Sequence, residues 1–165
     1  MTSILKSLFK VPVPSRPPIP AGKTRICVSG FGVSHNTGRA QKLAAEIAKQ
    51  EADKYETWFY FSTFCYRDFV RDFVSKELPE DQKKIPSTLD SEKPMEKHQS
   101  APFVWLEQGQ NEITAIGGRD RFCQWAAVNF PDNESIQALT SLEEPPFSEL
   151  FFDNATPGGT YLNSK

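Results

Sequence analysis

Residues 101–122 read A-P-F-V-W-L-E-Q-G-Q-N-E-I-T-A-I-G-G-R-D-R-F, and this stretch decides the fold. Phe103–Leu106 and Glu112–Ile116 are rich in β-branched and aromatic residues, which predicts two short strands. Residues 108–110 supply a turn between them, so the pair forms a hairpin. Arg119–Phe130 follows with apolar residues at helical spacing. The stretch therefore predicts a hairpin followed by a helix.

Working outward toward the N-terminus, the chain predicts two strand–helix units. Arg25–Ser29 is a short apolar run typical of a buried strand, and Thr57–Phe61 is an aromatic one. Each precedes a segment with one apolar stripe at helical spacing: Arg39–Lys54, and a second helix that runs to Leu78. Because a helix crosses over between the first two strands, we expect them to be parallel.

Helix caps are predicted from polar residues just before these stripes. Asn36 or Thr37 is the expected cap of the first helix, and Ser62 that of the second.

The rest of the chain divides into three parts. Residues 1–22 form a basic, proline-rich arm, in which V-P-V-P-S-R-P-P-I-P at 11–20 predicts an extended conformation. Residues 23–131 form the folded domain, and residues 132–165 an irregular C-terminal extension. Inside the domain, residues 79–99 are polar and punctuated by proline, and we interpret them as a mobile loop.

Composition excludes several classes of function. A net charge of −2 argues against a general nucleic-acid binder, and no stretch is apolar enough to span a membrane. Cys27, Cys65 and Cys123 are far apart and form no C-x-x-C, which is typical of reduced, buried thiols in an intracellular protein. Together with His35 and His98 they show no metal-ligand spacing, so we predict no metal site.

The N-terminal charge pattern leaves two localisations open. No acidic residue precedes Glu46, whereas lysines and arginines are frequent there, and this resembles a mitochondrial presequence. We favour a basic arm on a cytoplasmic protein, including a cytoskeletal or ciliary one, and keep the mitochondrion as the alternative.

The order of elements, strand–helix–strand–helix–hairpin–helix, resembles that of glutaredoxins. The segments S-A-P-F-V-W-L-E and E-I-T-A-I-G-G-R-D-R-F resemble that family's proline-preceded strand and its Gly-Gly-x-Asp helix start. The likeness covers roughly Thr24–Phe130. It implies an α/β thioredoxin fold (β-α-β-α-β-β-α) with a four-stranded mixed sheet, in which Arg25–Ser29 and Phe103–Leu106 are central. It also implies a cis bond between Ala101 and Pro102.

The same resemblance places a degenerate active-site loop at the start of the first helix. Glutaredoxins carry C-P-Y-C or C-G-F-S there, and the matching residues are Ser34, His35, Asn36 and Thr37. The family's chemistry needs a thiolate of lowered pKa at a helix N-terminus, and a serine hydroxyl cannot replace it. We therefore expect no enzyme activity, no cofactor and no iron–sulfur cluster.

Two non-redox groups of glutaredoxin-like proteins are similar: the SH3-binding glutamate-rich-like proteins, which lack the active-site cysteines, and the N-terminal region of divergent malate-dehydrogenase-like proteins. The lost cysteines and the long irregular tails of this chain favour a non-catalytic interaction or structural subunit whose partners are other protein subunits. The alternative is a protein that binds glutathione or retains thiol-related chemistry, using the loop at 34–37 and a second group of residues. These are Ala101, Pro102, Gly117, Gly118, Arg119 and Asp120, where helix N–H groups favour a carboxylate.

The two tails are the expected partner-binding surfaces. Ordering a tail costs about 1–2 kcal/mol per residue unless it buries apolar surface, and both tails carry apolar anchors. The anchors are Leu5, Phe9 and Pro17 in the first, and Phe147, Phe151, Phe152 and Tyr161 in the second.

Overall fold

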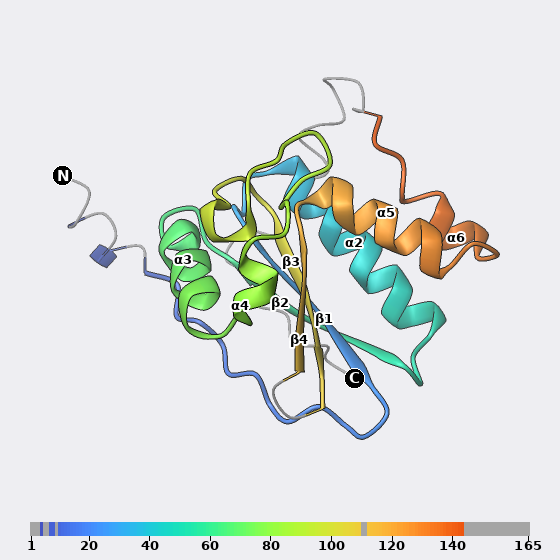
Figure 1. Cartoon of the computed structure of the whole chain (residues 1–165). Helices are drawn as coiled ribbons and strands as arrows, with labels where there is room; N and C mark the ends of the chain where they lie inside the picture. The colour runs from blue at the N-terminus through green and yellow to red at the C-terminus, as the bar shows by residue number, and fades with distance from the viewer. Residues whose placement is uncertain (1–3, 5–6, 9, 110–111, 144–165) are drawn as a thin grey trace.

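The computed structural model describes residues 4, 7–8, 10–109 and 112–143, and these form an α/β fold around one open sheet (Figure 1). The described residues contribute four strands: β1 (Thr24–Gly30), β2 (Tyr55–Phe61), β3 (Phe103–Gln108) and β4 (Glu112–Gly117). Their order is β2-β1-β3-β4. The β1–β2 pair is parallel, whereas the β1–β3 and β3–β4 pairs are antiparallel. The mixed sheet and the central position of β1 and β3 are as expected from the sequence.

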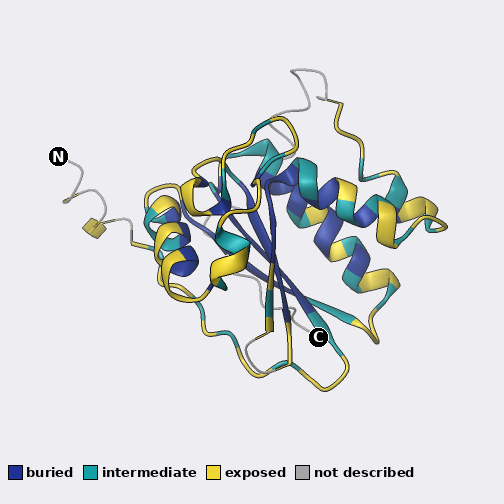
Figure 2. Ribbon diagram, viewed as in Figure 1, coloured by how far each residue is buried: buried dark blue, intermediate teal, exposed yellow. Residues whose placement is uncertain are grey.

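Helices cover both faces of the sheet (Figure 1). The first face carries α2 (His35–Gln50), α5 (Arg119–Asn129) and α6 (Glu134–Gln137). The second carries α3 (Tyr66–Lys76), α4 (Glu80–Lys83) and the 3₁₀ helix η1 (Met95–Lys97). Side chains alternate along β1, so Ile26 and Val28 pack under the first group and Cys27 under the second. Burial is concentrated in the strands and on the inner faces of the long helices (Figure 2).

The long helices differ from their predicted bounds at their ends. Helix α2 starts at His35 and stops at Gln50, and its cap is Ser34 rather than Asn36 or Thr37. It ends early because Glu51 leaves the helical backbone angles, with φ −121° and ψ 48°, and a turn over residues 51–54 leads into β2 at Tyr55. Before α3, the Ser62 hydroxyl accepts a hydrogen bond from the Cys65 N–H at 3.0 Å, so it caps a turn ahead of the helix.

Residues 79–99, interpreted above as a mobile loop, fold back on the domain. They contain α4, η1 and a bridge between Pro86 and Pro94. The Ser87 N–H donates to the Lys93 carbonyl oxygen at 2.8 Å, which closes the segment on itself. Met95 is fully buried in the core under α3. The polar composition misled the prediction because one buried methionine and backbone hydrogen bonds hold the segment.

The C-terminal extension was predicted to be irregular, but its first residues form α6. The Asn133 side-chain oxygen accepts a hydrogen bond from the Ile136 N–H at 3.0 Å and caps the helix. Ile136 is fully buried in the core of the first face, where α6 packs against α2 and α5. The core therefore extends past Pro131, where the sequence placed the end of the folded domain.

Residues 10–22 of the proline-rich arm run along the second face. The Tyr60 hydroxyl donates to the Val11 carbonyl oxygen at 2.9 Å, and the Trp58 indole N–H donates to that of Ser15 at 3.3 Å. Arg16 forms ion pairs with Glu77 and Glu107. The arm thus supplies backbone acceptors and a guanidinium to buried aromatic and acidic groups of the domain.

Candidate functional site

In the loop after β1, the hydroxyl residues Ser34 and Thr37 have structural roles. Ser34 has extended backbone angles, and its side-chain oxygen accepts from the Thr37 N–H at 3.5 Å, at the start of α2. The Ser34 carbonyl oxygen accepts from the Gly38 N–H at 3.0 Å. Ser34 therefore caps the helix at the position where the glutaredoxin resemblance puts a nucleophilic thiol.

The other loop residues are partly or fully enclosed. Thr37 is fully buried, and its side chain packs so closely on Gly30 that a Cβ added there would lie 2.2 Å from the Thr37 Oγ1. Asn36 Oδ1 and Thr37 Oγ1 have no hydrogen-bond partner within the described ranges. His35 is half-buried in the first turn of α2. The loop thus offers packing and a helix cap.

None of the three cysteines belongs to this loop, and all three are free thiols. Cys27 is fully buried in the middle of β1, where desolvation and the neighbouring Glu107 raise the pKa of its thiol well above the usual value. Burial on α5 also raises the pKa of Cys123. Cys65 is half-buried just before α3. A raised pKa keeps a thiol protonated, so Cys27 and Cys123 lack the thiolate that exchange chemistry needs.

The helix start implied as a glutathione carboxylate site is occupied by the chain itself. The Gly118 N–H donates to the Ser87 carbonyl oxygen at 2.7 Å. The Asp120 carboxylate accepts from the Leu89 N–H at 2.6 Å and from the Arg121 N–H at 2.8 Å. Folding back of residues 79–99 therefore consumes the polar groups that an anion would use.

Two further residues of this predicted group have other roles. Gly117 has φ +106°, and a Cβ there would lie 2.3 Å from the Ser87 carbonyl oxygen. Arg119 is largely buried and donates to the Ser141 carbonyl oxygen at 3.3 Å. Gly117 therefore lets the segment at Ser87 approach the end of β4, and Arg119 joins the head of α5 to the segment after α6.

The bond between Ala101 and Pro102 is cis, as the resemblance implies. The Pro102 carbonyl oxygen lies 3.1 Å from His98 Nε2. Burial lowers the pKa of His98, so the ring is neutral near pH 7 and Nε2 carries the proton donated to Pro102. The histidine thereby ties the fold-back segment to the start of β3.

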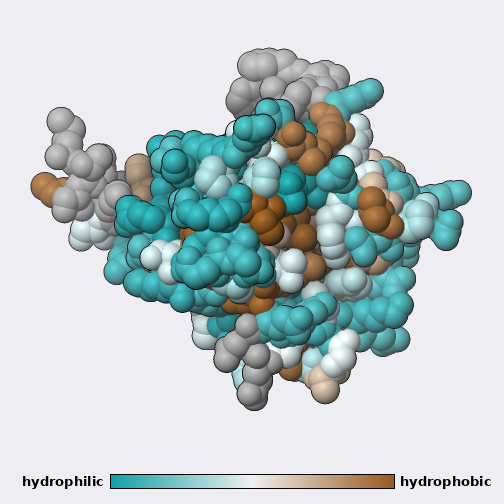
Figure 3. All heavy atoms as spheres, viewed as in Figure 1, coloured by the Kyte–Doolittle hydropathy of each residue, from teal (hydrophilic) through white to brown (hydrophobic). Residues whose placement is uncertain are grey.

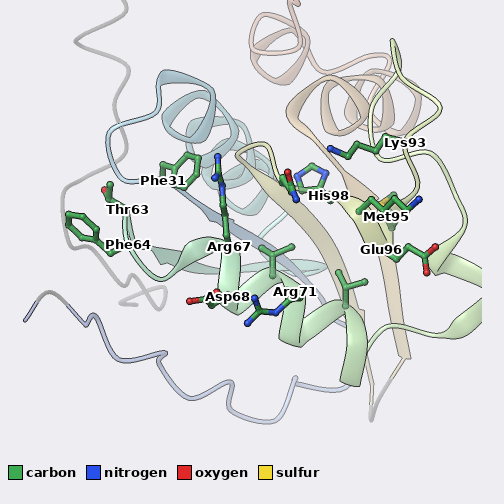
Figure 4. Close-up of a pocket in the computed structure, with 14 residues that line it drawn as sticks. Phe31, Thr63, Phe64, Arg67, Asp68, Arg71, Lys93, Met95, Glu96 and His98 are labelled. Carbon is green, nitrogen blue, oxygen red and sulfur yellow. Dashed lines mark ion pairs between the residues drawn. The ribbon is translucent and has the colours of Figure 1, made fainter. Parts of the chain in front are cut away.

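A groove beside this region was not predicted from the sequence. It has a volume of about 790 Å³ and lies between α3 and residues 93–99, with Phe31 and Phe64 at one end (Figure 4). Its basic side chains come from two separate segments, and only the fold-back of residues 79–99 brings them together. The charge pattern gave no signal, because residues 67–74 carry two arginines and two aspartates, and residues 79–99 carry four lysines and five carboxylates.

The expected tail anchors are placed only in part. Pro17 lies in the arm, and its carbonyl oxygen accepts from the Arg25 guanidinium at 2.7 Å. The remaining anchors lie outside the described residues: Leu5, Phe9, Phe147, Phe151, Phe152 and Tyr161.

Two kinds of feature are absent from the described ranges. They contain no cluster of three or more His, Cys, Asp or Glu side chains arranged to hold a metal ion. No helix in the same ranges has the length and apolar character needed to cross a membrane.

Comparison with known proteins found no matching family model, curated protein or solved structure.

Proposed function

We propose that this chain is a redox-inactive, thioredoxin-like interaction subunit of a larger protein assembly. The order β-α-β-α-β-β-α and the sheet order β2-β1-β3-β4 support the thioredoxin-like assignment, since they match the arrangement that the glutaredoxin resemblance implies. In this proposal the domain is a scaffold whose surfaces bind other protein subunits.

One observation carries the proposal: Ser34, at the head of α2, acts as a helix cap where a glutaredoxin would carry its nucleophile. A hydroxyl there has no accessible ionised form near pH 7, and the buried thiols of Cys27 and Cys123 are protonated. The glutathione-binding alternative gains no support, because Ser87 and Leu89 already use the groups at Gly118 and Asp120. Within the described residues this loop supplies a helix cap and a packing contact, which supports a binding role over thiol chemistry.

The test is the native size of the full chain in the cells that make it. A tagged copy at its natural level should elute from a sizing column well above the position of the purified chain, in reducing buffer. The same elution is expected for Cys65→Ser, since no disulfide is needed. If the cellular chain elutes at the position of the purified chain, the proposal of an assembly subunit is wrong.

A further inference from the structure

The groove beside α3 combines four structural parts, visible in Figure 4. One wall is the side of α3 that carries Arg67, Val70, Arg71 and Val74, and the opposite wall is residues 93–99. The loops after β1 and β2 close one end with Phe31 and with Thr63 and Phe64. Eight residues of α3 span about 10 Å at 1.5 Å per residue, which is the length of about three residues of extended chain. The groove therefore fits a short linear segment.

The charges of the groove favour an anionic occupant. Four of its lining side chains are lysine or arginine, whereas two are carboxylates. Each carboxylate already has a partner: Glu96 pairs with Lys84 at 2.7 Å, and Asp68 with Arg71 at 3.1 Å.

Three basic side chains of the groove are available to pair with a bound anion. Arg67, Lys93 and Lys97 are exposed and form no ion pair with any residue that the structure describes. The whole chain has a net charge of −2, so this positive excess is a local feature of the groove.

The apolar part of the groove favours an aromatic anchor. Val70, Val74 and Met95 are buried beneath it, and Phe64 is 43% exposed at its end. The Arg67 guanidinium lies 5.5 Å from the centre of the Phe31 ring, and Phe31 packs edge-on against Tyr66 at 4.8 Å. This arrangement holds Arg67 over the groove and leaves a rigid aromatic rim against which another ring can pack. Figure 3 shows hydrophilic surface over α3 and α4 bordering hydrophobic groups near the middle of the view.

We propose that this groove binds a short acidic segment of a partner protein, with one aromatic residue packing beside Phe31 and Phe64. The inference rests on the proposed function as an interaction subunit and names the partner chemistry. Carboxylates on either side of the aromatic residue pair with Arg67 on one wall and with Lys93 and Lys97 on the other. The chain's own arm does not fit, because residues 1–22 contain no acidic residue.

The test uses the full chain and a fluorescein-labelled peptide of sequence E-E-D-F-E-E, followed by fluorescence anisotropy. Arg67→Glu should weaken binding about tenfold or more, since it converts an attraction into a repulsion of similar size. Lys93→Glu should do the same. The matched control is Lys76→Glu, an equal charge reversal on α3 outside the groove, where the lysine is 74% exposed. This control should change affinity less than threefold.

The aromatic anchor is tested from both sides. Replacing the peptide phenylalanine by alanine, or Phe64 by alanine in the protein, should each weaken binding several-fold. Higher salt should also weaken binding, because exposed ion pairs are screened. No binding at about 1 mM peptide, or equal losses for Arg67→Glu and Lys76→Glu, would overturn the proposal.

One further variant separates a partner from the chain itself. Residues 144–165 include Glu149 in an aromatic stretch, so this acidic segment is a competing occupant. If Glu149→Lys raises peptide affinity several-fold, the chain's own segment competes for the groove and the partner assignment is wrong. Unchanged affinity supports it. If the peptide does not bind but the cellular chain still elutes at a large size, the groove proposal is wrong and the proposed function stands. If the cellular chain elutes at the position of the purified chain, the proposed function is wrong.

Discussion

The Gly118 backbone N–H donates a 2.7 Å hydrogen bond to the carbonyl oxygen of Ser87, and this bond joins the fold-back segment to the head of α5. The first N–H groups of a helix have no partner inside the helix and commonly bind anions. Here a carbonyl oxygen of the same chain takes that place. This contact helps to hold residues 79–99 against the domain. It also occupies the helix N–H group that the glutaredoxin resemblance implies as a glutathione-binding group.

Gly117→Ala should destabilise the protein by about 2–4 kcal/mol, because the new methyl group meets Ser87 and the backbone adopts a left-handed φ of +106°. Urea unfolding measures the loss. Gly109→Ala is the control: it also has a positive φ, +53°, but no atom within 4 Å of the added carbon. It should cost about 1 kcal/mol. Equal losses at the two glycines would mean that the Ser87 contact contributes nothing.

Ile136→Ala should cost about 2–5 kcal/mol, since it removes a fully buried side chain and leaves a cavity. The matched control is Val128→Ala on α5, where the side chain is 72% exposed and the expected change is within about 0.5 kcal/mol. Thermal or urea unfolding of both variants measures the two changes in the free energy of unfolding. A near-zero effect at Ile136 would show that α6 lies outside the cooperative core.

His98 should make stability fall as the pH is lowered through the range just below its usual pKa of 6.5. Burial lowers the pKa of His98 in the folded protein, so between the two pKa values the unfolded chain binds more protons. The stabilisation is therefore complete above pH 6.5 and is lost as the pH falls through the folded-state pKa. His98→Gln should flatten the dependence of the unfolding free energy on pH between about 7.5 and 5.5, where carboxylates contribute little. An unchanged slope would contradict this assignment.

Of the three thiols, Cys65 should react first with an aromatic disulfide reagent under native conditions. Cys27 and Cys123 are 0% and 2% exposed, whereas Cys65 is half-buried, so access decides the order. Cys65→Ser should remove the fast phase, and all thiols should react in urea. A fast phase that survives in Cys65→Ser would place Cys27 or Cys123 at the surface.

The hairpin and the helical stripes were predictable because they depend on local patterns. Runs of apolar, aromatic and β-branched residues located the four strands of the described residues, and the 3.6-residue periodicity located the three long helices, with errors mainly at the helix ends. The end of α2 was missed because it depends on Glu51, whose backbone leaves helical angles so that the chain can turn into β2 at Tyr55. The polar residues that follow Gln50 give no indication that the helix ends there.

The fold-back segment and the groove were not predictable in the same way. Their order depends on contacts far apart in the sequence, such as Asp120 with Leu89, and the Gln82 side chain with the backbone of Ile113 and Ala115. A polar segment without periodicity gives no indication of such long-range hydrogen bonds. The loop at Ser34 was found in advance only through its resemblance to a family motif, and its capping geometry required the structure.

A glutathione-coupled disulfide reduction assay on the full chain tests most directly the claim that the loop at Ser34 has no thiol chemistry. With a glutaredoxin as positive control, we expect turnover equal to the blank, because Ser34 and Thr37 provide a cap and a packing contact in place of thiols. Turnover above the blank that disappears in Cys65→Ser, Cys27→Ala or Cys123→Ala would contradict this claim and make the chain a thiol enzyme.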